Sequence, residues 1–175
     1  MERATSIMGG RIFSSIVPVA LGVLGALISN FPISVFGGLI PPPLLVLMPL
    51  YFWGIVRPDL MTPFWAFALG VLEDLLCGGP PGVWAASFLA AYALIDRQRD
   101  MLAGLSGIGA IAGFAVAALV ACASSFFIVA IYYWRIPPLA PVMAELAMTV
   151  LVYVFVVFFL GAVHRRLVGP LRSDF

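Results

Sequence analysis

Long apolar segments alternate with short polar gaps along almost the whole chain. A helix that crosses a membrane needs roughly 20 mostly apolar residues, and six segments approach that length. They are Ile12 to Ser29, Gly38 to Val56, Thr62 to Cys77, Pro80 to Ile95, Leu105 to Tyr132 and Val142 to Val163. The pattern therefore predicts a single membrane domain over residues 1–175, an all-α bundle of six transmembrane helices. We expect the first segment to be a retained anchor, because no good signal-peptide cleavage site follows it.

Two of these segments are irregular. Pro41, Pro42 and Pro43 cannot lie inside a helix, so regular helix is expected to begin near Pro43, after extended backbone near the outer surface. Backbone of that kind inside a membrane has to be covered by protein. The apolar stretch from Met101 to Trp134 would be about 50 Å long as one helix, which exceeds a hydrocarbon core of about 30 Å. It is expected to tilt, bend or begin along the membrane surface.

Composition agrees with the membrane class. The chain is 63% hydrophobic and 10% charged, whereas soluble domains are roughly half apolar and a quarter charged. It contains no lysine, and its nine cationic side chains are all arginines in the gaps between apolar segments. This leaves no basic patch for nucleic acid.

The arginines predict the orientation. With the amino terminus inside, only Arg135 lies outside, and the other eight are cytoplasmic: Arg3, Arg11, Arg57, Arg97, Arg99, Arg165, Arg166 and Arg172. The positive-inside rule therefore favours two cytoplasmic termini. Aromatic triplets at 51–53 and 132–134 precede Arg57 and Arg135, as expected of belts at the membrane interface.

Small residues recur every four positions, which places them on one helical face and lets helices approach closely. The longest such face runs through Gly109, Gly113, Ala117, Ala121 and Ser125. Shorter faces are Pro18, Gly22 and Ala26; Ala66, Gly70 and Asp74; and Gly82, Ala86 and Ala90. We interpret the longest face as internal helix packing, with recognition of a partner helix as the alternative.

Glu73 and Asp74 are adjacent carboxylates within an apolar run, and charge at membrane depth is costly and tends to mark function. Asp74 shares its face with Gly70, so we expect it to point to protein. Three interpretations stay open for the pair: bonds that hold helices together through amides, a hydroxyl or Arg135; a shared proton; or an Asp74 cap on the turn from Gly78 to Gly82. Glu73 lies about 100° away on the helix and is expected to tolerate replacement better.

The sequence carries little evidence for a disulfide, a metal site or a catalytic group. Cys77 and Cys122 are interpreted as small core residues, and the single His164 as an interface residue at an inner helix end. No second histidine or close cysteine pair completes a metal site, and no nucleophile arrangement or phosphate loop is present. We therefore expect no enzyme activity and no cofactor.

The segment from Pro49 to Tyr92 carries a family pattern. Its elements are Pro49, Tyr51 to Trp53, Arg57-Pro58, Phe67-x-x-Gly70-x-x-x-Asp74, and Pro81-Gly82 followed by Ala85 or Ala86 and by Tyr92. The chain resembles the rod shape-determining protein MreD family, small inner-membrane proteins of bacterial cell elongation. Departures are Pro81, where leucine is commoner, and the acidic Glu73 beside the aspartate.

The resemblance implies a non-catalytic scaffold that binds the single-span periplasmic protein MreC. It also implies that the protein belongs to the elongation complex with cytoskeletal MreB, the RodA glycosyltransferase and its transpeptidase. The protein is expected to contact membrane lipid, and whether it forms a homodimer is left open. The implied fold is similar to the substrate-binding subunits of energy-coupling-type transporters. A vitamin-transporter subunit of that type is the rival hypothesis, but it would require an enclosed polar pocket, and the chain offers few polar side chains for one.

Overall fold

The structure is a computed structural model that describes residues 2–31, 41–104 and 108–168, with side chains described from residue 16 onward. This part of the chain is all-helical, without strands. The elements are α1 (Glu2–Ser29), α2 (Leu47–Val56), α3 (Pro63–Cys77), α4 (Val83–Arg97), α5 (Arg99–Ala103), α6 (Ile108–Tyr133), α7 (Leu139–Val163) and the π-helical turn η2 (His164–Val168).

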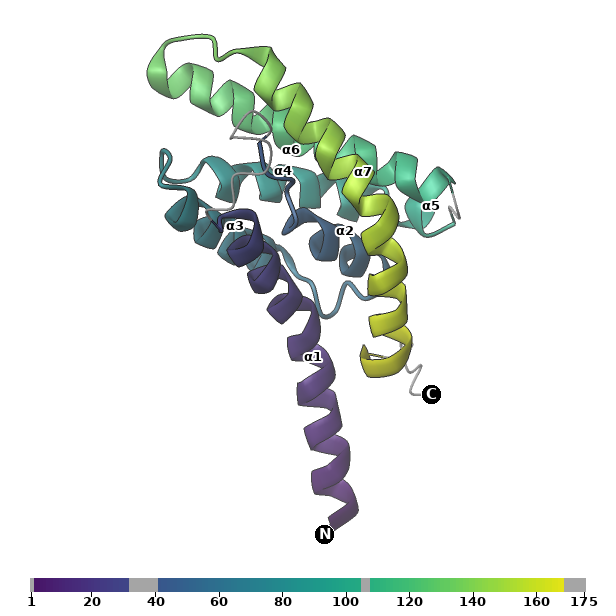
Figure 1. Cartoon of the computed structure of the whole chain (residues 1–175). Helices are drawn as coiled ribbons and strands as arrows, with labels where there is room; N and C mark the ends of the chain where they lie inside the picture. Colours follow the sequence, from purple (N-terminus) through teal and green to yellow (C-terminus); the bar gives the residue numbers. More distant parts are fainter. Residues whose placement is uncertain (1, 32–40, 105–107, 169–175) are drawn as a thin grey trace.

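The helices pack as a bundle in which α4 runs opposite to both α3 and α6 (Figure 1). Helix α6 runs across the upper part of the view and α7 descends from its far end to the lower side, while α3 and α4 form a shorter hairpin beneath α6. The short α2 lies among these helices. The start of α1 and the end of α7 both point to the lower side of the view.

Aromatic side chains fill the centre of the bundle. Tyr51 on α2 packs edge-on against Phe114 on α6 and Tyr153 on α7, whose own rings stack with centroids 3.7 Å apart. Tyr51 and Trp53 are 2% and 0% exposed, so the prediction that this triplet forms an interface belt is wrong. The reason is that α2 is surrounded by other helices, which bury nearly all its faces. Tyr132 to Trp134, by contrast, are exposed.

The start of α2 also differs from the prediction. Regular helix begins at Leu47, four residues after Pro43, and Gly38 to Ile40 of the predicted span lie outside the described residues. Residues 41–44 are irregular, and the protein covers them only in part: Leu44 is buried, whereas Pro42 is exposed. The Leu44 amide donates to Thr149 Oγ1 at 2.9 Å, and Ser29 Oγ donates to the Pro43 carbonyl at 2.9 Å. These bonds replace those that a helix would have supplied.

Three other boundaries follow the sequence more closely. The helix predicted over Thr62 to Cys77 is α3, with Pro63 in its first turn. Helix α4 starts at Val83, after Gly82 in the left-handed region at φ 92°. The overlong stretch from Met101 is divided into α5, which ends at Ala103, and α6, which starts at Ile108.

Two helices are long and apolar enough to cross a membrane, Ile108–Tyr133 and Leu139–Val168. Their outward faces carry large apolar side chains such as Phe127, Phe155 and Phe158. Helices that expose such residues to this extent need lipid or protein around them. Ile16–Ser29 and Leu47–Val56 are shorter apolar helices.

Candidate functional site

Part of the family pattern, Gly70, Asp74 and Gly82, lies where α3 turns into α4. Gly78 and Gly82 both have positive φ, 64° and 92°, which glycine adopts without the steric penalty of a side chain. They turn the chain sharply, so that α4 runs back along α3. About two turns before Gly78, Gly70 on α3 lies against the backbone of α4: a Cβ added there would be 2.7 Å from the Ala85 nitrogen and 2.8 Å from the Trp84 carbonyl oxygen. Only glycine fits at this crossing.

Asp74 caps the start of α4. Its Oδ2 accepts the amides of Gly82 at 2.9 Å and Ala85 at 3.2 Å, and its Oδ1 accepts the amide of Trp84 at 2.8 Å. The first amides of a helix have no partner within it, so the carboxylate supplies the missing acceptors. The predicted cap on the turn from Gly78 to Gly82 is therefore confirmed in part, because Asp74 accepts the Gly82 amide of that turn and two further amides from the first turn of α4. Arg135 is exposed in the loop after α6 and pairs with neither carboxylate in the described part of the chain.

Glu73 is equally buried, at 5% exposure, and joins α3 to the end of α1. Asn30 Nδ2 donates to Glu73 Oε1 at 2.7 Å and also to the Ala26 carbonyl at 3.0 Å. The second oxygen, Glu73 Oε2, is buried and has no hydrogen-bond partner in the described structure. Glu145, half-buried on α7, lies within electrostatic range of Glu73.

The long small-residue face of α6 is buried inside the chain. Gly113, Ala117, Ala121 and Ser125 are buried and Gly109 is half-buried. A Cβ added to Gly113 would collide with the Tyr51 hydroxyl and lie 2.8 Å from Leu102 Cδ2. The interpretation as internal packing is confirmed.

The small-residue face predicted on α4 is wrong. Gly82 and Ala86 are exposed and Ala90 is half-buried, whereas the packed face carries Ala85, Phe88, Ala91, Tyr92 and Ile95. The contact between Gly70 and Ala85 fixes this orientation. Cys77 is likewise exposed rather than in the core, unlike Cys122.

Arg57 and Pro58 lie in the loop between α2 and α3. Arg57 donates from Nε and Nη2 to the two Asp59 oxygens, at 2.9 and 2.7 Å. These bonds hold the pKa of Asp59 below its usual value and raise that of Arg57. Pro58 is half-buried beside them. Tyr92 ties the same loop to α4, because its hydroxyl donates to the Met61 carbonyl at 2.7 Å.

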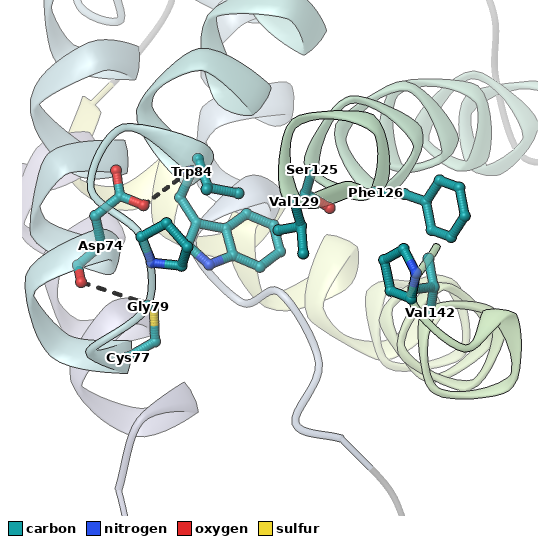
Figure 2. A pocket seen from close by; sticks show the side chains of 11 residues that line it. Asp74, Cys77, Gly79, Trp84, Ser125, Phe126, Val129 and Val142 are labelled. Atoms are coloured by element: carbon teal, nitrogen blue, oxygen red, sulfur yellow. Dashed lines mark hydrogen bonds between the residues drawn. The ribbon is translucent and has the colours of Figure 1, made fainter. Parts of the chain in front are cut away.

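A small cavity opens beside Asp74, between the α3–α4 turn, the end of α6 and the start of α7 (Figure 2). Its volume is about 150 Å³. Cys77, Trp84, Phe126 and Val142 line it from three sides, and Ser125 contributes a hydroxyl. The Asp74 oxygens are directed to the turn amides, so the cavity walls are mainly apolar.

Sequence reasoning did not single out Asn30 as a partner of Glu73. The available signal was a polar side chain directly after an apolar segment, which is common and weak.

Within the described residues, no group of three or more histidine, cysteine, aspartate and glutamate side chains could hold a metal ion. The arrangement defines a helix-joining and helix-capping site in an all-helical, strongly apolar protein.

Comparisons with models of protein families, with curated proteins and with solved structures found no match.

Proposed function

We propose that the protein is a multi-pass scaffold of the bacterial inner membrane, of the MreD type. In this proposal it crosses the membrane six times with both termini in the cytoplasm. It binds the single-span protein MreC and thereby helps the elongation complex to control rod shape and peptidoglycan synthesis.

The observation that carries the proposal is the packing of the family pattern. The most specific part of that pattern contains Gly70, Asp74 and Gly82, and these residues act together where α3 meets α4. Gly70 permits the close helix crossing, Asp74 caps α4, and Gly82 forms the left-handed turn. Residues that depend on one another in this way support a resemblance better than scattered identities do.

The chain path supports the proposed topology. Asn30 after α1 bonds Glu73 near the end of α3, and the start of α4 bonds Asp74. Arg57, after α2, lies within electrostatic range of His164, after α7. Helix ends predicted outside thus gather at one end of the bundle, and those predicted inside gather at the other.

The cavity beside Asp74 favours a scaffold over a vitamin-transporter subunit. Pockets for small molecules need a few placed polar groups, whereas this cavity of about 150 Å³ is lined mainly by apolar side chains. A larger groove of about 580 Å³ between α6 and α7 is lined only by apolar residues. A scaffold needs no such pocket, because helix faces and short loops suffice to bind a partner span.

Purification in mild detergent tests the proposal. The tagged protein, expressed in a rod-shaped bacterium, is expected to retain a single-span periplasmic coiled-coil protein, identified by mass spectrometry. A tagged membrane protein of similar length and span number is the control for non-specific capture. Recovery of a pair of ABC-type ATPases instead would overturn the scaffold and favour the transporter subunit.

A further inference from the structure

The chain turns sharply where α6 ends, at the upper left of Figure 1. Trp134 has a positive φ of 50° and is the one residue other than glycine with this conformation in the described structure. The Trp134 amide donates to the Ile131 carbonyl at 3.4 Å. The Arg135 amide donates to the Ala130 carbonyl at 3.2 Å. These two bonds form a Schellman motif, which folds Arg135 back beside the last turn of α6.

Tryptophan is an unfavourable residue at this position of the motif. A side chain in the left-handed region is strained, which is why glycine usually occupies it. Strain of this kind tends to be kept where the side chain has a function. The Trp134 side chain is 90% exposed, so packing inside the protein does not offset the strain. We therefore expect the indole to contact a molecule outside the chain.

The same turn forms one side of a groove. Its volume is about 270 Å³, and it is lined by Phe127, Ala130, Ile131, Trp134, Arg135 and Ile136. Phe127 and Ile131 are 63% and 69% exposed, and together with Trp134 they lie at helical spacing on one face. The apolar wall is about 10 Å long, because the seven residues from Phe127 to Trp134 each add 1.5 Å.

Arg135 gives this groove a cationic end. Its side chain is exposed, and the ion pairs among the described residues lie at other arginines. A guanidinium group binds phosphate well, because it presents several donors in one fixed plane. The groove therefore joins an apolar wall to a group that attracts an anion.

The length of α6 places the cationic end at the depth of lipid headgroups. Its 26 residues span about 39 Å, which exceeds a hydrocarbon core of about 30 Å. Tyr132, Tyr133 and Trp134 are exposed at this end, and tyrosine and tryptophan are enriched where membrane meets water. A molecule with an apolar tail and a phosphate at that depth matches both ends of the groove.

We propose that this groove binds one phospholipid of the outer leaflet. Arg135 pairs with the lipid phosphate, the Trp134 indole covers the glycerol region, and Phe127 and Ile131 contact the first part of an acyl chain. The bound lipid holds the loop between α6 and α7 at the membrane surface. This inference rests on the proposed membrane topology, with Arg135 outside, and on no protein partner.

Native mass spectrometry of the purified protein in mild detergent, with phosphatidylglycerol added, tests the site. The wild-type chain is expected to retain one lipid, and Arg135→Gln should weaken retention about fivefold or more, because it removes a charge-assisted hydrogen bond. Arg97→Gln is the matched control, since Arg97 is an exposed arginine at the end of α4; it should retain lipid as the wild type does.

Trp134→Gly separates binding from folding. Glycine relieves the strain at this position, so the Tm should rise by about 2 °C, while lipid retention should fall because the indole is lost. A lower Tm would overturn the proposal, since the tryptophan would then serve the fold and not a ligand.

Three other results would also overturn it. Equal retention by the wild type and Arg135→Gln would show that the phosphate does not bind there. Displacement of the lipid by excess glycerol phosphate would assign the groove to a soluble phosphate compound. Loss of a co-purifying protein from Arg135→Gln, with lipid retention unchanged, would assign it to protein recognition. Because lipid retention is measured without a partner, a negative result leaves the proposed binding of MreC standing, whereas recovery of the protein from cells without detergent would refute the membrane topology itself.

Discussion

Gly70 on α3 and Ala85 on α4 bring the backbones of two antiparallel helices into direct contact. This contact sets the rotation of α4, and Asp74, one turn further along α3, bonds the amides that the same approach brings within reach. The crossing and the cap therefore depend on each other. The geometry of the α3–α4 unit leads to the first two predictions.

Replacing Gly70 with alanine should destabilise the protein, because the added Cβ would overlap the Ala85 backbone. Overpacking of this kind costs about 1 to 3 kcal/mol, which corresponds to a fall in Tm of roughly 2 to 4 °C per kcal/mol for a chain of this size. Gly104→Ala is the control, since a Cβ there would make ordinary contacts at 3.6 Å. Equal Tm values for the two variants would show that the helices do not meet at Gly70.

Replacing Asp74 with alanine removes the acceptor of three amides. A buried donor left without its acceptor costs about 1 to 3 kcal/mol, so the variant should melt lower and capture its partner less well. Asp74→Asn, which keeps one carbonyl oxygen, should be intermediate. Glu73→Ala should be milder, because Glu73 accepts one hydrogen bond. A larger loss for Glu73→Ala than for Asp74→Ala would reverse the assignment of the cap.

The buried face of α6 should not accept larger side chains. Leucine at Gly113 or Ala117 would enter space occupied by neighbouring side chains and should lower the stability of the isolated protein by about 1 to 3 kcal/mol. Val116→Leu is the matched control, because Val116 is on the same helix but 49% exposed. Normal melting together with loss of a co-purifying partner would instead assign the face to recognition.

The loop between α2 and α3 should show a pH effect at Asp59. Arg57 lowers the pKa of Asp59 through hydrogen bonds, so the ion pair is present above the usual carboxyl pKa and is lost as pH falls through the lowered value. Arg57→Gln should move the Asp59 pKa up toward its usual range, as measured by carbon NMR of labelled aspartate. Asp100 in the same sample serves as the internal control. An unchanged Asp59 titration would mean that the pair does not form.

Labelling of single cysteines should place Arg97 and Arg135 on opposite sides of the membrane. In a chain with Cys77 and Cys122 replaced by serine, a cysteine at position 97 should react only after the membrane is permeabilised. A cysteine at position 135, in the exposed loop after α6, should react in intact spheroplasts. Reaction of both from the same side would rule out the six-span topology.

The sequence by itself determined the features that depend on local spacing. Its apolar periodicity and composition predicted an all-helical, strongly apolar chain, and the position of Asp74 before a glycine-rich turn made a cap on that turn one of three predicted roles. The small-residue repeat likewise identified the packed face of α6. These features depend on residues of one helix or of the turn directly after it, where local geometry fixes which side chains share a face.

Only the tertiary structure decided which distant groups meet. Asn30 bonds Glu73 across 43 residues, and the Leu44 amide bonds Thr149 across 105, pairings that no local pattern specifies. Burial of Tyr51 in the core and the rotation of α4 follow from the same cause, because both depend on which helices surround them. A side chain's face is a local property, whereas the partner it contacts is set by how all the helices pack.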